Sequence, residues 1–177
     1  MSPKTLRHPV LDALSDHPPE VRFQWLLGWF VSEMVDLDYL LADCVAAVLG
    51  DDNSFAVDAW GESGARLKAL GSKAVEKESG LKRIVEQYEE VYLARNHLVH
   101  GLYDGSTPVS GDVTYTLTRL ERCRKTGSRY GVKAWTFTLA ELGEMTDVVV
   151  ALRNRCSAII DQYRRTRSAD RDQRDPA

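Results

Sequence analysis

Apolar residues recur at helical spacing along three long stretches of the chain. They run from Glu20 to Leu49, from about Gly80 to His100, and from Thr138 to Tyr163. Three or four apolar positions per two turns is the pattern of helices that pack by one face. The first stretch predicts a single helix about 45 Å long at 1.5 Å per residue. A shorter stretch, Ser63 to Ala74, predicts a small second helix between the first two.

The segment from Leu102 to Phe137 does not follow the helical period. Tyr103 to Pro108 has the composition of a loop. The stretches Val113–Leu120 and Val132–Phe137 are rich in β-branched and aromatic residues, and the first of them alternates at period two, which predicts two strands. We therefore expect a β-hairpin inserted at about residues 103–137. Because an isolated hairpin is marginal in water, it must pack on the helices.

These elements predict an all-α fold, an antiparallel four-helix-type bundle with the hairpin between the third and last helices. Residues 1–20 carry four prolines and predict an irregular N-terminal segment. Residues 21–163 form one helical domain in this interpretation. Residues 164–177 alternate Arg and Asp without apolar periodicity, which predicts a disordered tail. Thr138 and Glu141 have the spacing of a capping box that opens the last helix.

Composition narrows the class of protein. Of 177 residues, 44% are apolar, enough for a proper core, and the net charge of -3 argues against a generally basic nucleic-acid surface. Any RNA binding must then use a local patch. The three cysteines (Cys44, Cys123 and Cys156) lack zinc-ligand spacing, so we expect neither a metal site nor a cofactor. With no signal peptide and no uninterrupted apolar span, we expect a soluble cytoplasmic protein without membrane contact.

The third helix ends in a group of polar residues. Arg95 continues the apolar stripe of that helix, and burying a guanidinium without partners costs several kcal/mol. Asn96 and His100 follow at i,i+4 spacing on an adjoining face, and Gly101 is a helix stop. One interpretation is structural, with Arg95 paired to a core carboxylate and His100 favoured by the helix dipole. Residues predicted to support Arg95 are acids of the first helix, foremost Glu33 and then Asp36.

The stretch Arg95-Asn96-His97-Leu98-Val99-His100-Gly101 resembles the motif of the HEPN superfamily (higher eukaryotes and prokaryotes nucleotide-binding domain). That motif is an arginine directly followed by a polar residue, with a histidine after four to six intervening residues. The resemblance spans roughly Val21 to Tyr163, but only the stretch from Arg95 to Gly101 matches a defined motif of the family. It implies a helical bundle that forms a homodimer, with two motif copies facing one cleft. Many members are metal-independent ribonucleases of toxin–antitoxin and phage-defence systems, and others are non-catalytic binding modules.

The resemblance implies catalytic roles for Arg95, Asn96 and His100. His100 is suited to acid–base chemistry on the ribose 2′-hydroxyl, and Arg95 to holding phosphate oxygens. Asn96 orients the imidazole or bonds a phosphate oxygen. The products are then a 2′,3′-cyclic phosphate and a 5′-hydroxyl. Arg95 and His100 lie about 140° apart around an ideal helix, so they converge only if the helix loosens before Gly101 or if two copies complement each other.

Two further groups of residues each allow two interpretations. Cations of the hairpin are either ordinary solvated charges or RNA contacts beside the motif: Arg119, Arg122, Arg124, Lys125, Arg129 and Lys133. A second face of the first helix is either a contact face inside the bundle or a subunit interface: Trp25, Trp29, Ser32, Asp36, Tyr39 and Asp43.

Three functions follow from these patterns. The first is a dimeric HEPN endoribonuclease, with RNA as substrate and an antitoxin protein as a possible partner. The second is a non-catalytic HEPN-like module that binds nucleotide, RNA or a partner protein. The third is a helical interaction protein in which Arg95 serves packing alone. The presence of Arg95, Asn96 and His100 together favours the first.

Overall fold

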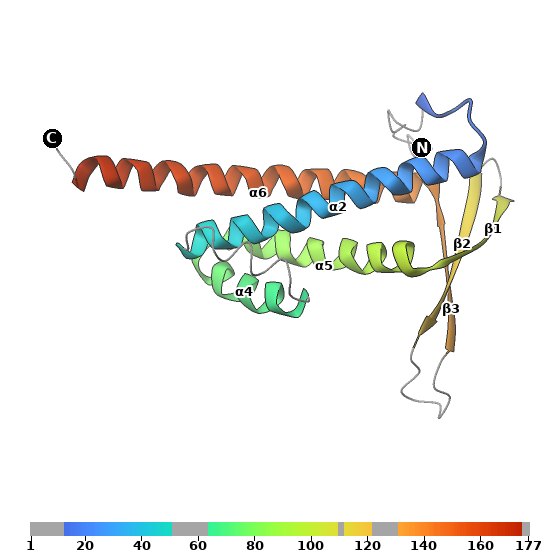
Figure 1. The fold of residues 1–177 in the computed structure, drawn as a ribbon, viewed down its shortest axis with the longest axis horizontal. Helices are drawn as coiled ribbons and strands as arrows, with labels where there is room; N and C mark the ends of the chain where they lie inside the picture. Colours follow the sequence, from blue (N-terminus) through green and yellow to red (C-terminus); the bar gives the residue numbers. More distant parts are fainter. Residues whose placement is uncertain (1–12, 51–63, 110–111, 122–130, 175–177) are drawn as a thin grey trace, which may run out of the picture. The chain divides into compact units, whose positions relative to one another are not determined.

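The computed structural model describes residues 13–50, 64–109, 112–121 and 131–174 (Figure 1). These residues are mostly helical, with a small antiparallel sheet of three strands. The elements in chain order are α2 (Pro19–Leu49), α4 (Gly64–Lys77), α5 (Ser79–His100), β1 (Leu102–Val109), β2 (Asp112–Glu121), β3 (Gly131–Thr138) and α6 (Leu139–Arg174). The mainly helical class and the positions of the long helices confirm the predictions from periodicity.

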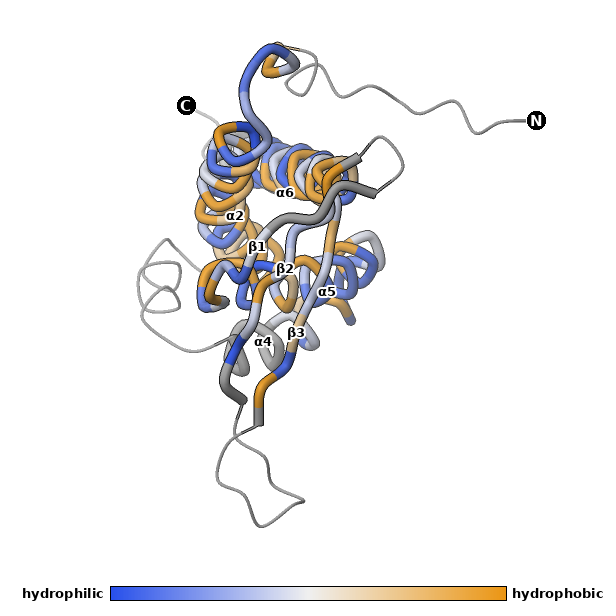
Figure 2. The backbone as a smooth tube through the Cα atoms, turned by 90° about the vertical axis from the view of Figure 1, so that its right-hand side faces the viewer, coloured by the Kyte–Doolittle hydropathy of each residue, from blue (hydrophilic) through white to orange (hydrophobic). Residues whose placement is uncertain are grey.

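The chain divides into two compact units, and the division passes through α2, α5 and α6. The first, here called the sheet unit, comprises Met1–Ser32 and Tyr92–Asp147. The second, the helical unit, comprises Glu33–Val91 and Val148–Ala177. Figure 2 shows apolar and polar residues alternating around α2 and α6, as expected of helices that bury one stripe.

Apolar stripes of α2, α5 and α6 form the core of the helical unit. Its buried side chains include Met34, Leu37, Leu41, Val45, Leu81, Ile84, Val149, Leu152 and Ile160. Polar contacts between the helices show their relative directions. Arg153 pairs with Glu33, and Arg164 Nη2 lies 3.1 Å from Asp43 Oδ2, so α6 runs parallel to α2. Contacts from Arg155 to Gln87 and from Tyr163 to Glu78 show that α5 runs antiparallel to α6.

Helix α6 continues to Arg174, past Tyr163, where the sequence predicts a disordered tail. The physical reason is a set of tertiary polar contacts that apolar periodicity does not reveal. Arg164 pairs with Asp43, and Arg167 Nη2 donates to the carbonyl of Ala47 at 2.8 Å. That carbonyl belongs to the last turn of α2, where helix carbonyls lack intrahelical partners. Arg167 therefore caps α2 while it extends α6.

Two cysteines lie inside the helical unit. Cys44 of α2 and Cys156 of α6 are fully buried free thiols, as expected of cysteines on apolar helix faces. A hydrogen bond between the two side chains, together with burial, raises the pKa of Cys44 above its usual value. The Cys44 thiol is thus held in the protonated, unreactive form. Cys123 lies outside the described residues.

Aromatic rings hold the sheet unit together. Phe23 of α2 stacks on Tyr115 of β2 with ring centroids 4.8 Å apart, and Tyr115 stacks on Phe137 of β3 at 5.8 Å. The Tyr115 hydroxyl donates to the carbonyl of Pro19 at 2.7 Å, which joins β2 to the first turn of α2. The capping box at α6 is confirmed, since Thr138 N donates to Glu141 Oε2 and Glu141 N to Thr138 Oγ1.

The predicted hairpin is a three-stranded sheet with order β1-β2-β3. The residues from Tyr103 to Pro108, which the sequence predicts to be a loop, belong to the edge strand β1. Glycine and proline suggest a loop, but an edge strand tolerates proline because one side of its backbone needs no partner. A register shift between Tyr103 and Gly105 marks a β-bulge, and Gly105 has a φ of 148°. Glycine adopts that conformation without the strain of a side chain.

Within the described part of the chain, none of the helices combines the length and apolar character required to cross a bilayer. Of the N-terminal segment, residues 1–12 lie outside the described residues. Pro19 opens α2, as expected of proline in a first helical turn.

Candidate functional site

The residues that resemble the HEPN motif lie in the last two turns of α5, within the sheet unit. The helix remains regular through His100, and the N–H of Gly101 donates to the carbonyl of His97 at 2.8 Å, which continues the i→i+4 pattern. The helix therefore does not loosen before Gly101. Arg95 and His100 of one chain diverge by about 140° around the helix axis. The first of the two expected ways for them to meet, a loosened helix end, is thus not observed.

Two guanidinium groups converge on Asn96. Arg95 Nη1 donates to Asn96 Oδ1 at 3.2 Å, and Arg119 Nη1 of β2 donates to the Asn96 carbonyl at 3.3 Å. Arg95, Asn96 and Arg119 are half-buried, whereas His100 is exposed. Near the carbonyl end of a helix, where the dipole is negative, a cation is favourable. The result is a local concentration of positive charge in a protein whose net charge is -3.

Arg119 also contacts the backbone of the helical turn that carries His100. In an α-helix, the N–H of residue i bonds the carbonyl of residue i−4, so the Asn96 carbonyl is the acceptor for the N–H of His100. Arg119 bonds that same carbonyl. Sequence reasoning selects Arg119 only as an RNA contact, because the contact with α5 is tertiary. The structure gives it a second role, which is to hold the turn that carries His100.

Two other contacts fix the end of α5 on the sheet. The ring centroids of His97 and Trp135 of β3 lie 5.6 Å apart, so the half-buried His97 packs against the sheet. A Cβ at Gly101 would lie 2.6 Å from the His97 carbonyl oxygen and 3.0 Å from Leu117 Cβ of β2. Real Cβ atoms essentially never approach as closely as the first distance, so the backbone of the α5 end itself requires glycine here, and the tight approach of β2 adds to that requirement.

The predicted RNA contacts fall into two sets. Arg119 and Lys133 are described, and they are direct partners across the β2–β3 ladder. Cross-strand partners project from the same face of a sheet. Lys133 is exposed, so this pair extends the positive charge around Asn96. The remaining candidates lie outside the described residues: Arg122, Arg124, Lys125 and Arg129.

The predicted supporting acids bind another arginine. Glu33 pairs with Arg153 of α6, and Asp36 Oδ2 lies 3.5 Å from Arg153 Nη2, all within the helical unit. Support of Arg95 by these acids stays a prediction. Sequence reasoning missed Arg153, although the available signal was the same as for Arg95. Arg153 is a cation beside Leu152 and Cys156 on the apolar stripe of α6.

Several apolar side chains within and next to the motif in sequence are exposed. Leu93 is 61% exposed, Val99 41% and Leu102 73%, and Tyr103 is 47% exposed at the start of β1. Where exposed apolar side chains form a contiguous patch, they are typical of an interaction surface. This composition is compatible with contact between two copies of the motif.

Among the described residues, no group of three His, Cys, Asp or Glu side chains is placed to hold a metal ion. Comparison of the chain with models of protein families, with curated proteins and with solved structures found no match. The candidate site is therefore defined by its own geometry: two guanidiniums on Asn96 and an exposed imidazole one turn later.

Replacing Arg119 with alanine removes the hydrogen bond to the Asn96 carbonyl. We expect amide hydrogen exchange at His100 and Gly101 to accelerate, and the free energy of unfolding to fall by about 1 kcal/mol. Lys133→Ala is the matched control, because Lys133 lies opposite Arg119 in the ladder and its side chain is exposed. Equal exchange rates at His100 in both variants would contradict this role for Arg119.

Proposed function

We propose that this chain is a metal-independent endoribonuclease of HEPN type that acts as a homodimer. The observation that carries the proposal is the convergence of Arg95 and Arg119 on Asn96, one helical turn before the exposed His100. This arrangement places fixed positive charge for a phosphate and a titratable imidazole at the same helix end. In this proposal the helices form a HEPN-type bundle, and the biological setting is a toxin–antitoxin or phage-defence system.

The proposed chemistry follows from the residue types. His100 accepts the proton of a ribose 2′-hydroxyl, whose oxygen then attacks the adjacent phosphorus. The P–O5′ bond breaks, which leaves a 2′,3′-cyclic phosphate, and the leaving 5′-oxygen takes up a proton from water to become the 5′-hydroxyl. Arg95 stabilises the charge that develops on the phosphorane oxygens, because a guanidinium stays protonated and holds two oxygens at once. Asn96 orients Arg95 through its side-chain oxygen.

The dimer is part of the proposed mechanism because Arg95 and His100 of one chain diverge. Two-fold contact through the exposed apolar residues near the motif brings the Arg95 of one copy to the His100 of the other. The cleft between the copies then holds the scissile phosphate. The cations Arg119 and Lys133 flank it and contact phosphates of the RNA on either side.

The proposal is tested by incubating wild type, Arg95→Ala and His100→Ala with structured and single-stranded RNA in excess EDTA. We expect cleavage by wild type, products with cyclic-phosphate ends, and rates lower by about 10²-fold or more in both variants. His17→Ala, which alters an exposed histidine outside the motif, is the control and retains activity. Oligomeric state is measured in parallel.

A non-catalytic module is the second candidate, and one observation favours it. Arg95 Nη1 already bonds Asn96 Oδ1, which orients the guanidinium, so its other N–H groups can present a preformed anion site without any base. In that case RNA or nucleotide binds with an affinity that depends on Arg95, while wild type shows no cleavage and His100→Ala binds normally. Binding measured beside cleavage thus separates the two functions.

A further inference from the structure

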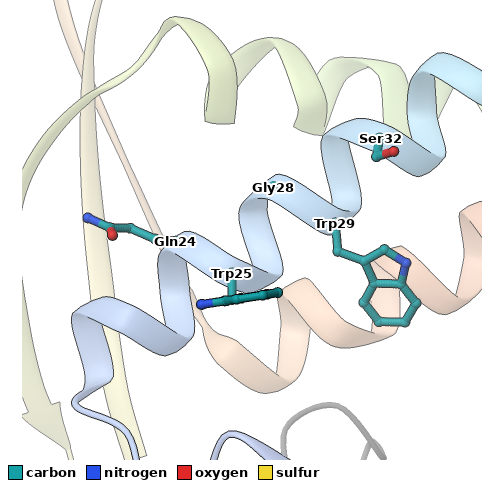
Figure 3. A pocket seen from close by; sticks show the side chains of 5 residues that line it. All are labelled: Gln24, Trp25, Gly28, Trp29 and Ser32. Atoms are coloured by element: carbon teal, nitrogen blue, oxygen red, sulfur yellow. The ribbon is translucent and has the colours of Figure 1, made fainter.

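Apart from the motif, the sheet unit exposes an aromatic side chain on α2 and the outer edge of β3. Trp25 of α2 is 66% exposed and borders a hollow, but Gln24, another lining residue, points away from its indole (Figure 3). The lining therefore does not converge on one ligand. On β3, Val132 is 71% exposed, and Ala134 and Thr136 are exposed as well. This edge presents backbone groups in a regular order, which restricts the kind of partner that fits.

Three residues of β3 direct their backbone N–H and C=O groups away from β2. The two strands pair along the whole of β3 without a register shift. The N–H of Thr138 donates to Glu141 Oε2 at 2.7 Å, so it does not face β2. In an antiparallel ladder every second residue faces the same way, so the backbone groups of Val132, Ala134 and Thr136 also point outward.

The other edge strand of the described sheet, β1, is protected against further pairing. A β-bulge between Tyr103 and Gly105 interrupts its register, and Pro108 lacks an N–H. Bulges and prolines on an edge strand obstruct the addition of another strand. Strand β3 has neither feature, because its sequence from Gly131 to Thr138 contains no proline and its ladder with β2 is unbroken. Of the two edges, β3 is therefore the one that is open to a further strand.

We propose that β3 pairs antiparallel with β3 of a second copy of this chain, which joins the two sheets into one. The pairing is centred on Ala134, so that Val132 faces Thr136 of the other copy and Ala134 faces its own equivalent. Each such pair exchanges two N–H···O bonds, and the outward backbone groups of all three residues are then satisfied. The inference deepens the proposed function, which requires a homodimer, and it rests on that function only for the role of the contact.

The residues of β3 make this edge complementary to itself. In the centred register, Lys133 lies opposite Trp135 of the other copy, and the stem and ammonium of a lysine pack favourably on an indole. A shift by two residues in one direction places Lys133 opposite Lys133, where like charges repel. The opposite shift places Val132 against Thr138, whose N–H is already committed to Glu141. One register thus suits both the backbone and the side chains, which favours a second copy as the partner.

This pairing also places the two motifs on the same side of the joined sheet. The two-fold axis is perpendicular to the sheet, because paired residues of the two copies project from the same face. In each copy the end of α5 packs on the face that carries Trp135, where the His97 ring centroid lies 5.6 Å from that of Trp135. Both α5 ends therefore lie on one face, as a composite site requires.

Single cysteines introduced into the full-length Cys123→Ala chain test the register, with diamide as the oxidant and non-reducing gels as the readout. Ala134→Cys places two thiols on opposed residues whose Cα atoms are about 5.5 Å apart, within disulfide range. We expect a covalent dimer from Ala134→Cys and from a mixture of Val132→Cys with Thr136→Cys. Each of the latter two variants alone stays monomeric on the gel, because its equivalent Cα atoms are about 14 Å apart.

A proline variant tests the backbone bonds in the unmodified interface. Ala134→Pro removes an outward N–H without removing a bond to β2, so we expect the fold to persist and the dimer dissociation constant to rise at least about tenfold. Ala134→Thr keeps the N–H and is the matched control, with a dissociation constant close to that of wild type. Sedimentation measures the constants, and circular dichroism checks the fold.

Three outcomes overturn the proposal. A monomeric wild type leaves the β3 edge to a strand of another protein. Equal cross-linking of all the cysteine samples, or of none, shows that the strands do not pair about residue 134. A dimer that survives Ala134→Pro but is lost in Trp25→Ser places the subunit interface on α2. The cross-links form without RNA, so a register-specific dimer that cleaves no RNA contradicts the nuclease alone, whereas cleavage by a dimer without these cross-links contradicts the strand pairing alone.

Discussion

Mixing the Arg95→Ala and His100→Ala variants restores RNA cleavage that neither variant has alone. In the proposed two-fold dimer, each composite site takes Arg95 from one copy and His100 from the other. A mixed dimer therefore contains one site with both native residues and one with neither. Random exchange makes half of the dimers mixed, so we expect about a quarter of wild-type activity, against a loss of about 10²-fold or more in each pure variant.

The measurement is the initial rate of cleavage after the variants are mixed, exchanged and compared at equal total protein. A control mixture of Arg95→Ala with the double variant Arg95→Ala/His100→Ala contains no native Arg95 and stays inactive. If the mixture of single variants is as inactive as its components while size measurements confirm exchange, the composite site is wrong. That result would require Arg95 and His100 to act within one chain, which the regular helix through His100 opposes.

Replacing Gly101 with alanine lowers the free energy of unfolding by about 1–3 kcal/mol, the usual cost of inserting a methyl group into a packed site. The new Cβ meets the His97 carbonyl at 2.6 Å and Leu117 Cβ at 3.0 Å. The His97 carbonyl belongs to α5 itself and Leu117 to β2, so the backbone at the end of α5 must distort as well as shift from β2. Because Arg119 holds Asn96 from the same strand, we also expect reduced RNA cleavage. Thermal unfolding followed by circular dichroism measures the stability change.

Gly28→Ala is the matched control, with the opposite expected sign. Gly28 lies inside α2 and a Cβ there meets nothing within 4 Å. Alanine in a helix interior is more favourable than glycine by about 0.5–1 kcal/mol, so this variant unfolds at a higher temperature than wild type. If Gly28→Ala and Gly101→Ala change stability alike, close packing of Gly101 on β2 is not the cause.

Hydrophobic periodicity predicts well those elements that depend on interactions between residues close in sequence. Helices α2, α5 and α6 each bury one apolar stripe, which repeats at the helical period and is visible without tertiary information. The capping box of α6 is equally local, because Thr138 and Glu141 are three residues apart. The sequence predicts a loop in place of β1 because the composition of this segment is compatible with both structures. Gly105 and Pro108 suit a loop and also suit a bulged edge strand, and only pairing with β2 distinguishes the two.

The candidate site likewise has some features that follow from the sequence and others that depend on the tertiary structure. The identity and order of Arg95, Asn96 and His100, and their place at a helix end, follow from the sequence alone. Their partners do not. Arg119 is distant in sequence from Asn96, and Arg153 is far from Glu33, so neither pair can be inferred from spacing. Several cations are available to each acid or carbonyl, and only the packing of helices and strands selects one of them.

The sequence by itself determined the helical class, the stretches that form the helices, the cap of α6 and the polar end of α5, because each depends on interactions within a few residues of the chain. The tertiary structure decided that α5 stays regular through His100, that Arg119 and Gly101 fasten its end to β2, and that Trp25 remains exposed. Those features depend on contacts between residues far apart in sequence, whose free energy is set by how the elements pack.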